Sequence, residues 1–312
     1  MRRRFLLITT SKSGLEFARG LRYSGHRLIG IGRGYSRSQS PISAITASGP
    51  KVSFAEGVPT WEIDIDDKKE LSRFFDEFDF DFAVASWPRL LSAGIIELAN
   101  NRIVGTHPTP LPFGRGRHPL HWLRALGLRR SRLTAFWLDK GVDTGRKIWS
   151  IGFSISRFGN VRDDLRTVER KSLLLGIILG LILRLGVETR ALPPKKLGTL
   201  WAKRGEADSV IDFRMSPKAI VCHVRAVAMP WPQATFFDSD GGEHRIFDAR
   251  YAPLAGLRPS FRWETFGAIL RRESSSPTRL RILVRCFGGA VWLVIQEPES
   301  IAKLFPTGTN GD

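Results

Sequence analysis

One histidine in this chain lies in a segment suited to proton transfer. His107 follows a short apolar run at residues 103–105, and Pro108, Pro110 and Pro112 come after it. Proline fixes the backbone and restricts the residue before it, so we expect a rigid, extended loop here. An imidazole at the end of a strand suits general acid–base chemistry, because histidine titrates near neutral pH. The pattern therefore predicts a catalytic role for His107.

An aspartate in a glycine-rich segment is the natural candidate to act with this histidine. Residues 138–145 read Leu-Asp-Lys-Gly-Val-Asp-Thr-Gly and follow another predicted strand. Asp143 in this segment could pair with His107, which would orient the imidazole and stabilise its charged form. Spacing alone favours a different role, in which Asp143 is a turn residue that binds its own backbone. Both interpretations stay open at the level of the residues.

The elements that must position these residues alternate between strand and helix patterns. Short apolar runs predict strands at residues 5–9, 28–31, 80–86, 103–105 and 133–138. Amphipathic spacing or an initial proline predicts helices at residues 14–23, 67–78, 90–99 and 119–126. This alternation is typical of an α/β fold with a Rossmann-like parallel sheet and flanking helices. Ligands bind such sheets at the carboxyl ends of the strands.

The later part of the chain has a different pattern. A helical stretch from about 163 to 185 closes the first part, and Pro193-Pro194 breaks it. Ser216-Pro217 then predicts a new helix start. Strand patterns follow at residues 234–237, 245–251, 280–286 and 290–296. We therefore expect a catalytic domain over residues 1–195 and a smaller, mostly β-strand domain over residues 200–306.

The charge of the chain indicates an anionic partner. It holds 48 Lys and Arg against 30 Asp and Glu among 312 residues, a formal net charge of +18. Such a surface attracts nucleic acid, membrane headgroups or phosphorylated small molecules. A generally basic character without a specific partner is an equal alternative, because net charge governs association and not fold.

Cysteine usage and the apolar runs indicate the compartment. Cys222 and Cys286 lie in different segments without metal or redox spacing, which fits a reducing, cytoplasmic compartment. The run at residues 5–10 is too short for a signal peptide. The run at residues 173–183 is too short for a membrane span and predicts a buried helix. We therefore expect no membrane association.

Three groups of motifs follow one another in a distinctive order. The segment Ser-Trp-Pro-Arg-Leu-Leu-Ser occupies residues 86–92. A second group consists of His107, Thr109, Leu111-Pro112 and Arg115-Gly116-Arg117, followed some thirty residues later by Asp139, Gly141, Asp143, Thr144 and Gly145. The third comprises residues 211–213, 216, 225–226 and 230–232. In this order they resemble the formyltransferase family, which includes methionyl-tRNA, glycinamide ribonucleotide and sugar-nucleotide N-formyltransferases.

This resemblance implies a folate-dependent enzyme with 10-formyltetrahydrofolate as the formyl carrier. It implies that an amine attacks the formyl carbon, that His107 takes the amine proton or stabilises the intermediate, and that Asp143 orients His107. The residues implied to bind the carrier are Trp87, Arg89, Leu90, Leu91, Leu138, Asp139 and Val142. The residues expected to bind an anionic acceptor are Arg115, Arg117 and His118, and Arg124 is a further phosphate candidate.

One position departs from the family pattern. The family has Asn two residues before the catalytic His, and this chain has Gly105. In the family that Asn helps to bind the formyl oxygen as negative charge develops, and losing such a donor could cost about 10²–10³ in rate. A backbone amide, His118 or ordered water could replace it. A slow or non-catalytic protein that binds folate or RNA is therefore an alternative to an active transferase.

Two acceptors are compatible with the resemblance. Residues 33–50 lack the basic loop typical of the tRNA enzyme, which favours a nucleotide-linked amino sugar. The net charge of +18 and the basic second domain favour methionyl-tRNA instead. The sequence alone does not define the oligomeric state.

Two other patterns are weaker. His118 and His121 have the spacing of one helix face, and with His107 they could suggest a metal site. No cysteine or other clustered ligand accompanies these histidines, so we expect no metal. The glycines of residues 30–34 follow the second predicted strand and lack the spacing of a dinucleotide fingerprint, so we expect a turn there.

Overall fold

The computed structural model describes residues 1–35, 55–64, 67–87, 90–186, 198–229, 231–238, 241–252, 259–276 and 278–296. The chain forms two compact units. Unit 1 comprises Met1–Pro119, Arg130–Ser154 and Leu165–Ala202, and unit 2 comprises Leu120–Arg129, Ile155–Asp164 and Lys203–Asp312. The domain boundaries expected from the sequence stay a prediction.

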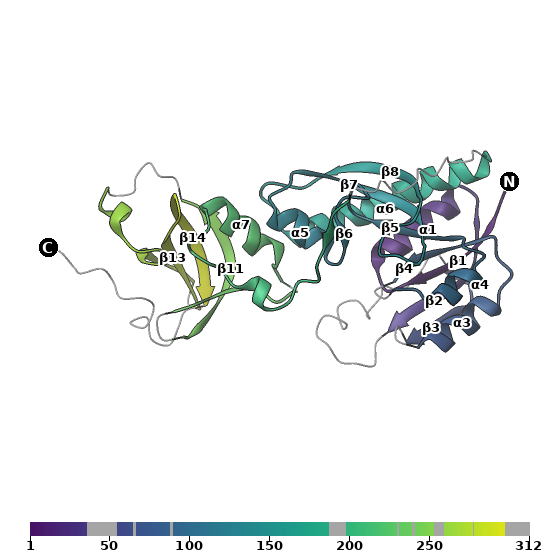
Figure 1. The fold of residues 1–312 in the computed structure, drawn as a ribbon, viewed down its shortest axis with the longest axis horizontal. Helices are drawn as coiled ribbons and strands as arrows, with labels where there is room; N and C mark the ends of the chain where they lie inside the picture. The colour runs from purple at the N-terminus through teal and green to yellow at the C-terminus, as the bar shows by residue number, and fades with distance from the viewer. Residues whose placement is uncertain are drawn as a thin grey trace. The chain divides into compact units, whose positions relative to one another are not determined.

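Unit 1 is built on a seven-stranded sheet in the order β3-β2-β1-β4-β5-β7-β8 (Figure 1). Its strands are β1 (Arg4–Thr9), β2 (Arg27–Tyr35), β3 (Thr60–Asp64), β4 (Phe82–Ser86), β5 (Ile103–His107), β7 (Arg130–Trp137) and β8 (Lys147–Ser154). The first five strands run parallel, as the strand–helix alternation predicts. The sheet is mixed, however, because β7 runs antiparallel to β5 and β8 antiparallel to β7. A loop as short as residues 138–146 can join only antiparallel neighbours.

Helices cover both faces of this sheet. On one face, α3 (Lys68–Asp76) and α4 (Ala93–Leu98) pack on a buried cluster that includes Leu6, Ile8 and Phe74. On the other face lie α1 (Lys12–Tyr23) and α6 (Val161–Arg184) (Figure 1). The imidazole of His26 lies 2.8 Å from the Gly180 carbonyl oxygen and joins the end of α1 to α6. The parallel strands therefore have a buried environment on both sides, as parallel sheets require.

The side chain of Ser11 begins α1, and the same kind of cap begins a helix of unit 2. Ser11 has an extended backbone, and its hydroxyl accepts a hydrogen bond from the Gly14 N–H. The helix α7 (Pro217–Ala226) is capped by Ser216, with Pro217 at its first position. This confirms the helix start predicted from the Ser-Pro pair.

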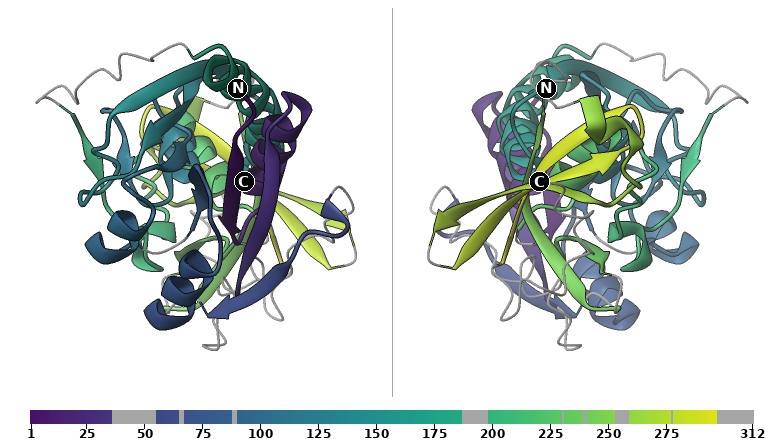
Figure 2. Two further views of the ribbon diagram at one scale, coloured as in Figure 1. Left: turned by 90° about the vertical axis from the view of Figure 1, so that its right-hand side faces the viewer. Right: turned by 90° about the vertical axis from the view of Figure 1, so that its left-hand side faces the viewer.

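Unit 2 contains a five-stranded antiparallel sheet in the order β10-β11-β14-β13-β12. Its strands are β10 (Ala234–Phe237), β11 (Glu243–Tyr251), β12 (Ile269–Ser276), β13 (Arg279–Cys286) and β14 (Gly289–Gln296), and Figure 2 (right) shows them in green to yellow. The helix α7 packs on one face of the sheet, where Ile220, Val224 and Leu293 are buried. The expected smaller domain of mostly β-strands is confirmed.

The described helices include none that could cross a membrane. The longest is α6, with 24 residues, and charged residues occupy its first half. The apolar run at residues 173–183 lies in this helix, where Leu175 and Leu179 are fully buried.

Candidate active site

His107 is the last residue of β5, at the carboxyl end of the parallel strands. The β5 strand lies between β4 and β7 in the sheet, so this position is fixed on both sides. The side chain is buried, with 7% of the residue exposed. Its Nε2 atom lies 2.9 Å from the Gly114 carbonyl oxygen, and its Nδ1 atom lies 3.5 Å from Oδ2 of Asp143. Both ring nitrogens therefore face oxygen atoms that accept hydrogen bonds.

Asp143 faces His107, and its carboxylate binds a backbone amide of a distant segment and not its own backbone. It lies in a turn and has a left-handed backbone, with φ of 51°. Aspartate is among the few residue types that tolerate this conformation. The same carboxylate faces His107 and accepts a hydrogen bond of 2.9 Å from the Gly116 N–H. The structure thus brings the predicted pair together.

A glycine-rich turn holds both members of the pair. The Gly114 carbonyl contacts the histidine, and the Gly116 amide contacts the aspartate. Gly116 has φ of 106°, and an added Cβ would lie 2.2 Å from the backbone oxygen of Trp201. Only glycine fits such a position without strain. The turn is fixed in place by pairing of β6 (Arg115–Gly116) with β9 (Leu200–Trp201).

A cavity of about 590 Å³ opens beside this pair, within unit 1. Six residues predicted to bind a folate carrier line it, namely Trp87, Leu90, Leu91, Leu138, Asp139 and Val142. The seventh, Arg89, lies outside the described residues. The volume falls in the range of small-molecule sites, which are mostly apolar with a few polar groups. The lining has this character.

The acceptor residues predicted from the sequence are only partly brought together. Arg117 lines the cavity, whereas Arg115 and His118 are absent from its lining. Arg115 belongs to β6, and His118 takes a left-handed backbone conformation with φ of 56°. Arg115 and His118 as acceptor ligands therefore remain predictions without support from the cavity lining.

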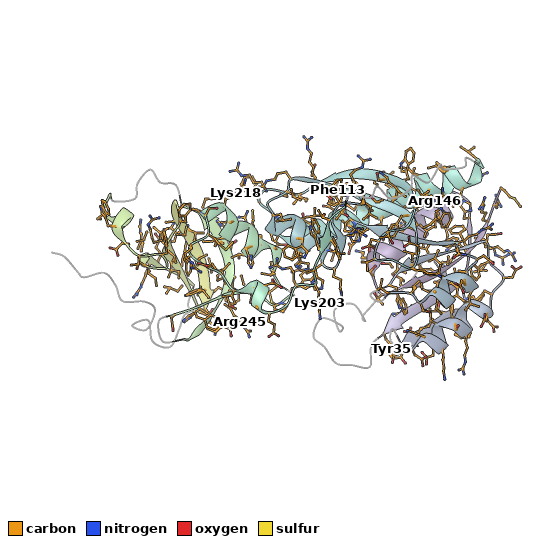
Figure 3. The ribbon with its side chains drawn as sticks, viewed as in Figure 1. Tyr35, Phe113, Arg146, Lys203, Lys218 and Arg245 are labelled. Carbon is orange, nitrogen blue, oxygen red and sulfur yellow. The ribbon has the colours of Figure 1, made fainter. Side chains whose placement is uncertain are left out.

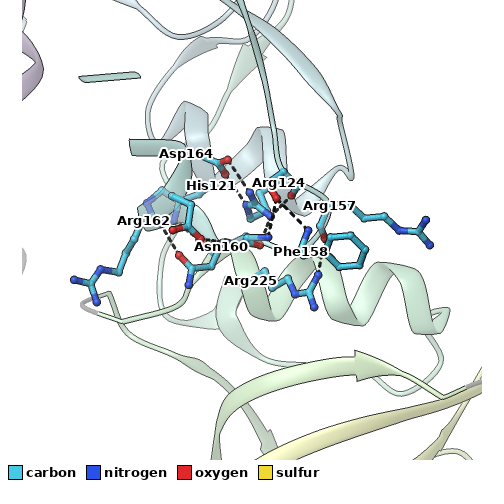
Figure 4. Close-up of polar contacts among 12 residues, drawn as sticks. His121, Arg124, Arg157, Phe158, Asn160, Arg162, Asp164 and Arg225 are labelled. Atoms are coloured by element: carbon cyan, nitrogen blue, oxygen red, sulfur yellow. Dashed lines mark hydrogen bonds and ion pairs between the residues drawn. The ribbon is translucent and has the colours of Figure 1, made fainter. Parts of the chain in front are cut away.

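Arg124, the further phosphate candidate, was assigned wrongly. It lies in unit 2 with 3% of its surface exposed, and it forms two hydrogen bonds of 2.6 and 2.7 Å to the Asp164 carboxylate (Figure 4). Its Nη1 also donates to the carbonyl oxygens of Ser156 and Gly159. A guanidinium whose donors are occupied in this way is unavailable to a ligand. No pattern in the sequence indicates that Asp164, forty residues away, is its partner.

Several lining residues were not predicted. Thr10, Ser86, Ile96, Thr106 and Phe136 also line the cavity. Thr10 follows β1 and Ser86 ends β4, so the rule that ligands bind at the carboxyl ends of parallel strands could have identified both. Phe136 and Ile96 carry no such signal, because apolar residues in a strand and a helix are normally core.

The space around Gly105 explains why this strand has no side chain there. An added Cβ would lie 2.6 Å from Cδ2 of Leu138 and 3.2 Å from the Phe136 ring. Leu138 is one of the residues predicted to frame the folate carrier. An Asn side chain at position 105 would therefore need the Leu138 side chain to move.

Metal chemistry has no visible support in the described part of the chain. No group of three His, Cys, Asp or Glu side chains there could hold a metal ion. His121, one of the histidines weighed as a ligand, instead places its Nδ1 atom 2.6 Å from the Ala226 carbonyl oxygen.

Comparison with known families identifies the chain. The family described as formyl transferase matches residues 32–171, and the formyl transferase C-terminal domain matches residues 204–304. The chain belongs to the formyltransferase family. The formyl carrier of this family is 10-formyltetrahydrofolate.

Relatives at the sequence level are methionyl-tRNA formyltransferases. The protein from Symbiobacterium thermophilum is 24% identical over 282 residues, covering 86% of this chain and 82% of its own. The protein from Desulforamulus reducens is 30% identical over 152 residues, covering 48% of this chain. This match covers 47% of the relative, so this chain spans about half of that protein's length.

Solved structures share the fold. HypX from Aquifex aeolicus in complex with tetrahydrofolic acid has a TM-score of 0.59 at 16% identity, covering 96% of this chain and 45% of its own. A sugar N-formyltransferase from a Shewanella species has a TM-score of 0.57 at 14% identity, covering 80% of this chain and 99% of its own. At such identities the likeness concerns the fold alone.

Proposed function

We propose that this chain transfers a formyl group from 10-formyltetrahydrofolate to a primary amine. The observation that carries the proposal is the pairing of His107 with Asp143, 3.5 Å apart, beside a cavity of about 590 Å³. A histidine oriented by a carboxylate next to a ligand cavity is the arrangement that general acid–base catalysis needs.

The contacts of His107 support Nδ1 as the ring nitrogen that acts as the base. A carbonyl oxygen can only accept, so Nε2 carries the hydrogen that is directed at Gly114. In the neutral ring Nδ1 is then unprotonated, and it would take the proton of an attacking amine that approaches beside the Asp143 carboxylate. Once protonated, Nδ1 faces the Asp143 carboxylate, which stabilises the positive charge. Asp143 is itself held by the Gly116 amide.

The cavity lining supports the other proposed roles. Bound 10-formyltetrahydrofolate would supply the formyl carbon that the amine attacks. Leu90, Leu91 and Leu138 would pack on its ring system, while backbone groups of the same loops bind its polar edge. Gly105 has no side chain to bind the formyl oxygen. Among the described lining residues, the Thr106 hydroxyl and the Arg117 guanidinium are donors that can take over this role.

Two acceptors each have an observation in their favour. A nucleotide-linked amino sugar, the acceptor favoured by the sequence analysis, is supported by Arg117, because an arginine in the cavity lining suits a pyrophosphate. Methionyl-tRNA is supported by the relatives that match both parts of the chain, and by the net charge of +18.

The test is a transfer assay with 10-formyltetrahydrofolate labelled in the formyl group. Purified chain is incubated with nucleotide-linked amino sugars and with methionyl-tRNA, and label in each acceptor is counted. We expect label in one acceptor class, and its loss in the His107→Gln variant. Folate binding without transfer to any amine would identify a binding protein instead, and no folate binding would refute the proposal.

A further inference from the structure

A second cavity of unit 1 carries four basic side chains. Its volume is about 680 Å³, and Arg3, Arg102, Lys140 and Arg146 line it. Arg3 and Arg102 directly precede β1 and β5, whereas His107 ends β5. The five residues of β5 span about 13 Å at a rise of roughly 3.3 Å per residue. This basic cavity therefore lies toward the amino ends of the strands, and the candidate active site at their carboxyl ends.

Among the described residues, nearby acids offset only part of the positive charge of the basic cavity. Lys140 lies 3.9 Å from the Glu97 carboxylate, and both side chains are exposed. Asp139, the one acid in the lining, accepts hydrogen bonds from the Gly141 N–H and the Thr144 hydroxyl. Within the described part of the chain, the three arginines form no ion pair. Like charges gathered in a concave surface attract an anion, and arginine binds phosphate oxygens with two parallel hydrogen bonds.

The basic cavity also offers an aromatic ring and two amides. Trp137 is half-buried in its lining, and its backbone N–H donates to the carbonyl oxygen of Arg146, which lines the same cavity. Asn100 and Asn101 line the same space from the turn before β5, with φ of 49° and 56°. An indole can stack on a flat base, and side-chain amides can both donate to and accept from its edge.

We propose that this basic cavity binds a nucleoside phosphate. The arginines would bind the phosphate groups, and Trp137 would stack on the base. Figure 3 labels Arg146 among the side chains of unit 1. The ligand is distinct from the reactants at His107, because His107, Asp143 and Arg117 are all absent from this lining. The two cavities share only Ile96, Leu138 and Asp139 as walls.

The test is calorimetric titration of the full chain with ATP, inorganic tripolyphosphate and inorganic phosphate at low ionic strength. We expect saturable ATP binding at one site and weaker binding of tripolyphosphate, which has the phosphates without the base. The double variant Arg3→Ala/Arg102→Ala should weaken ATP binding at least tenfold. The double variant Arg73→Ala/Arg170→Ala removes the same charge from exposed positions on α3 and α6 and should leave ATP binding unchanged.

Each part of the proposal can fail separately. Absence of saturable ATP binding, or equal loss in the two double variants, would overturn the site. Tripolyphosphate binding as tight as that of ATP would overturn the nucleoside part of the proposal. This comparison uses the wild-type chain, so it does not depend on whether a Trp137→Leu variant folds. The His107→Gln variant should bind ATP like the wild type. If it loses ATP, the nucleotide occupies the candidate active site and the separate cavity is refuted.

Discussion

At the scale of single residues, the site depends on backbone groups as much as on side chains. The Gly114 carbonyl oxygen contacts His107, and the Gly116 amide contacts Asp143. These two glycines are two residues apart in the same turn. In this chain the arrangement therefore needs the glycine turn as well as His107 and Asp143. The side-chain pair could be predicted from the sequence through the family motif. The hydrogen bonds to the turn could not, because they depend on backbone conformation.

Replacing Gly116 with alanine should disrupt this arrangement. The added Cβ would meet the Trp201 carbonyl oxygen at 2.2 Å, and φ of 106° is strained for alanine. We expect a loss of about 1–3 kcal/mol in unfolding free energy and at least tenfold slower formyl transfer. Urea unfolding and the transfer assay measure the two effects. Gly152→Ala is the matched control, because an added Cβ there has nothing within 4 Å.

Restoring the family's asparagine at position 105 should not restore a family-like site. Leu138 and Phe136 fill the space, so Gly105→Asn should cost about 1–3 kcal/mol of stability from overpacking. In a Leu138→Ala background the same change should cost at least about 1 kcal/mol less. Urea unfolding of the four variants gives this coupling. An equal cost in both backgrounds would show that Leu138 does not oppose the asparagine.

At the scale of elements, the strand ends explain most of the site. Thr10, Ser86 and His107 follow or end three neighbouring parallel strands, and these segments could be predicted from apolar runs. The antiparallel direction of β7 and β8 could not, because an apolar run carries no direction. The strand β8 pairs with β7, and its residues alternate between buried and exposed. The sequence patterns did not predict β8, β3 or β12. Their patterns are too mixed to separate from loops.

The helix α7 contains a histidine that should make stability depend on pH. Burial, with the nearby Arg204 guanidinium second, lowers the pKa of His223 to about 4. The unfolded chain then takes up a proton near pH 6.5, whereas the folded chain does so only near pH 4. Stability should therefore be complete above pH 6.5 and fall by up to about 3 kcal/mol as pH decreases to 4.

Urea unfolding at a series of pH values measures this dependence. A His223→Gln variant should lose the component between pH 6.5 and 4, because it cannot be protonated. If the variant and the wild type lose stability in parallel over that range, the acid sensitivity comes from other groups.

At the scale of the whole molecule, charge connects the fold to its partners. If methionyl-tRNA is the acceptor, the net charge of +18 predicts binding through phosphate contacts. The dissociation constant should then rise by roughly 10³-fold between 50 and 200 mM salt if at least six phosphates are contacted. Filter binding of tRNA at several salt concentrations measures this. Binding that is absent, or that changes less than tenfold, would favour a small acceptor.

We propose that His107 and Asp143 perform formyl transfer beside the cavity of unit 1. The most direct measurement is single-turnover transfer of labelled formyl by wild type, His107→Gln and Asp143→Asn, with 10-formyltetrahydrofolate binding measured on the same samples. We predict that both variants bind the carrier within a few-fold of wild type and transfer at least about 10²-fold more slowly. Transfer at near-normal rates by either variant would contradict the account.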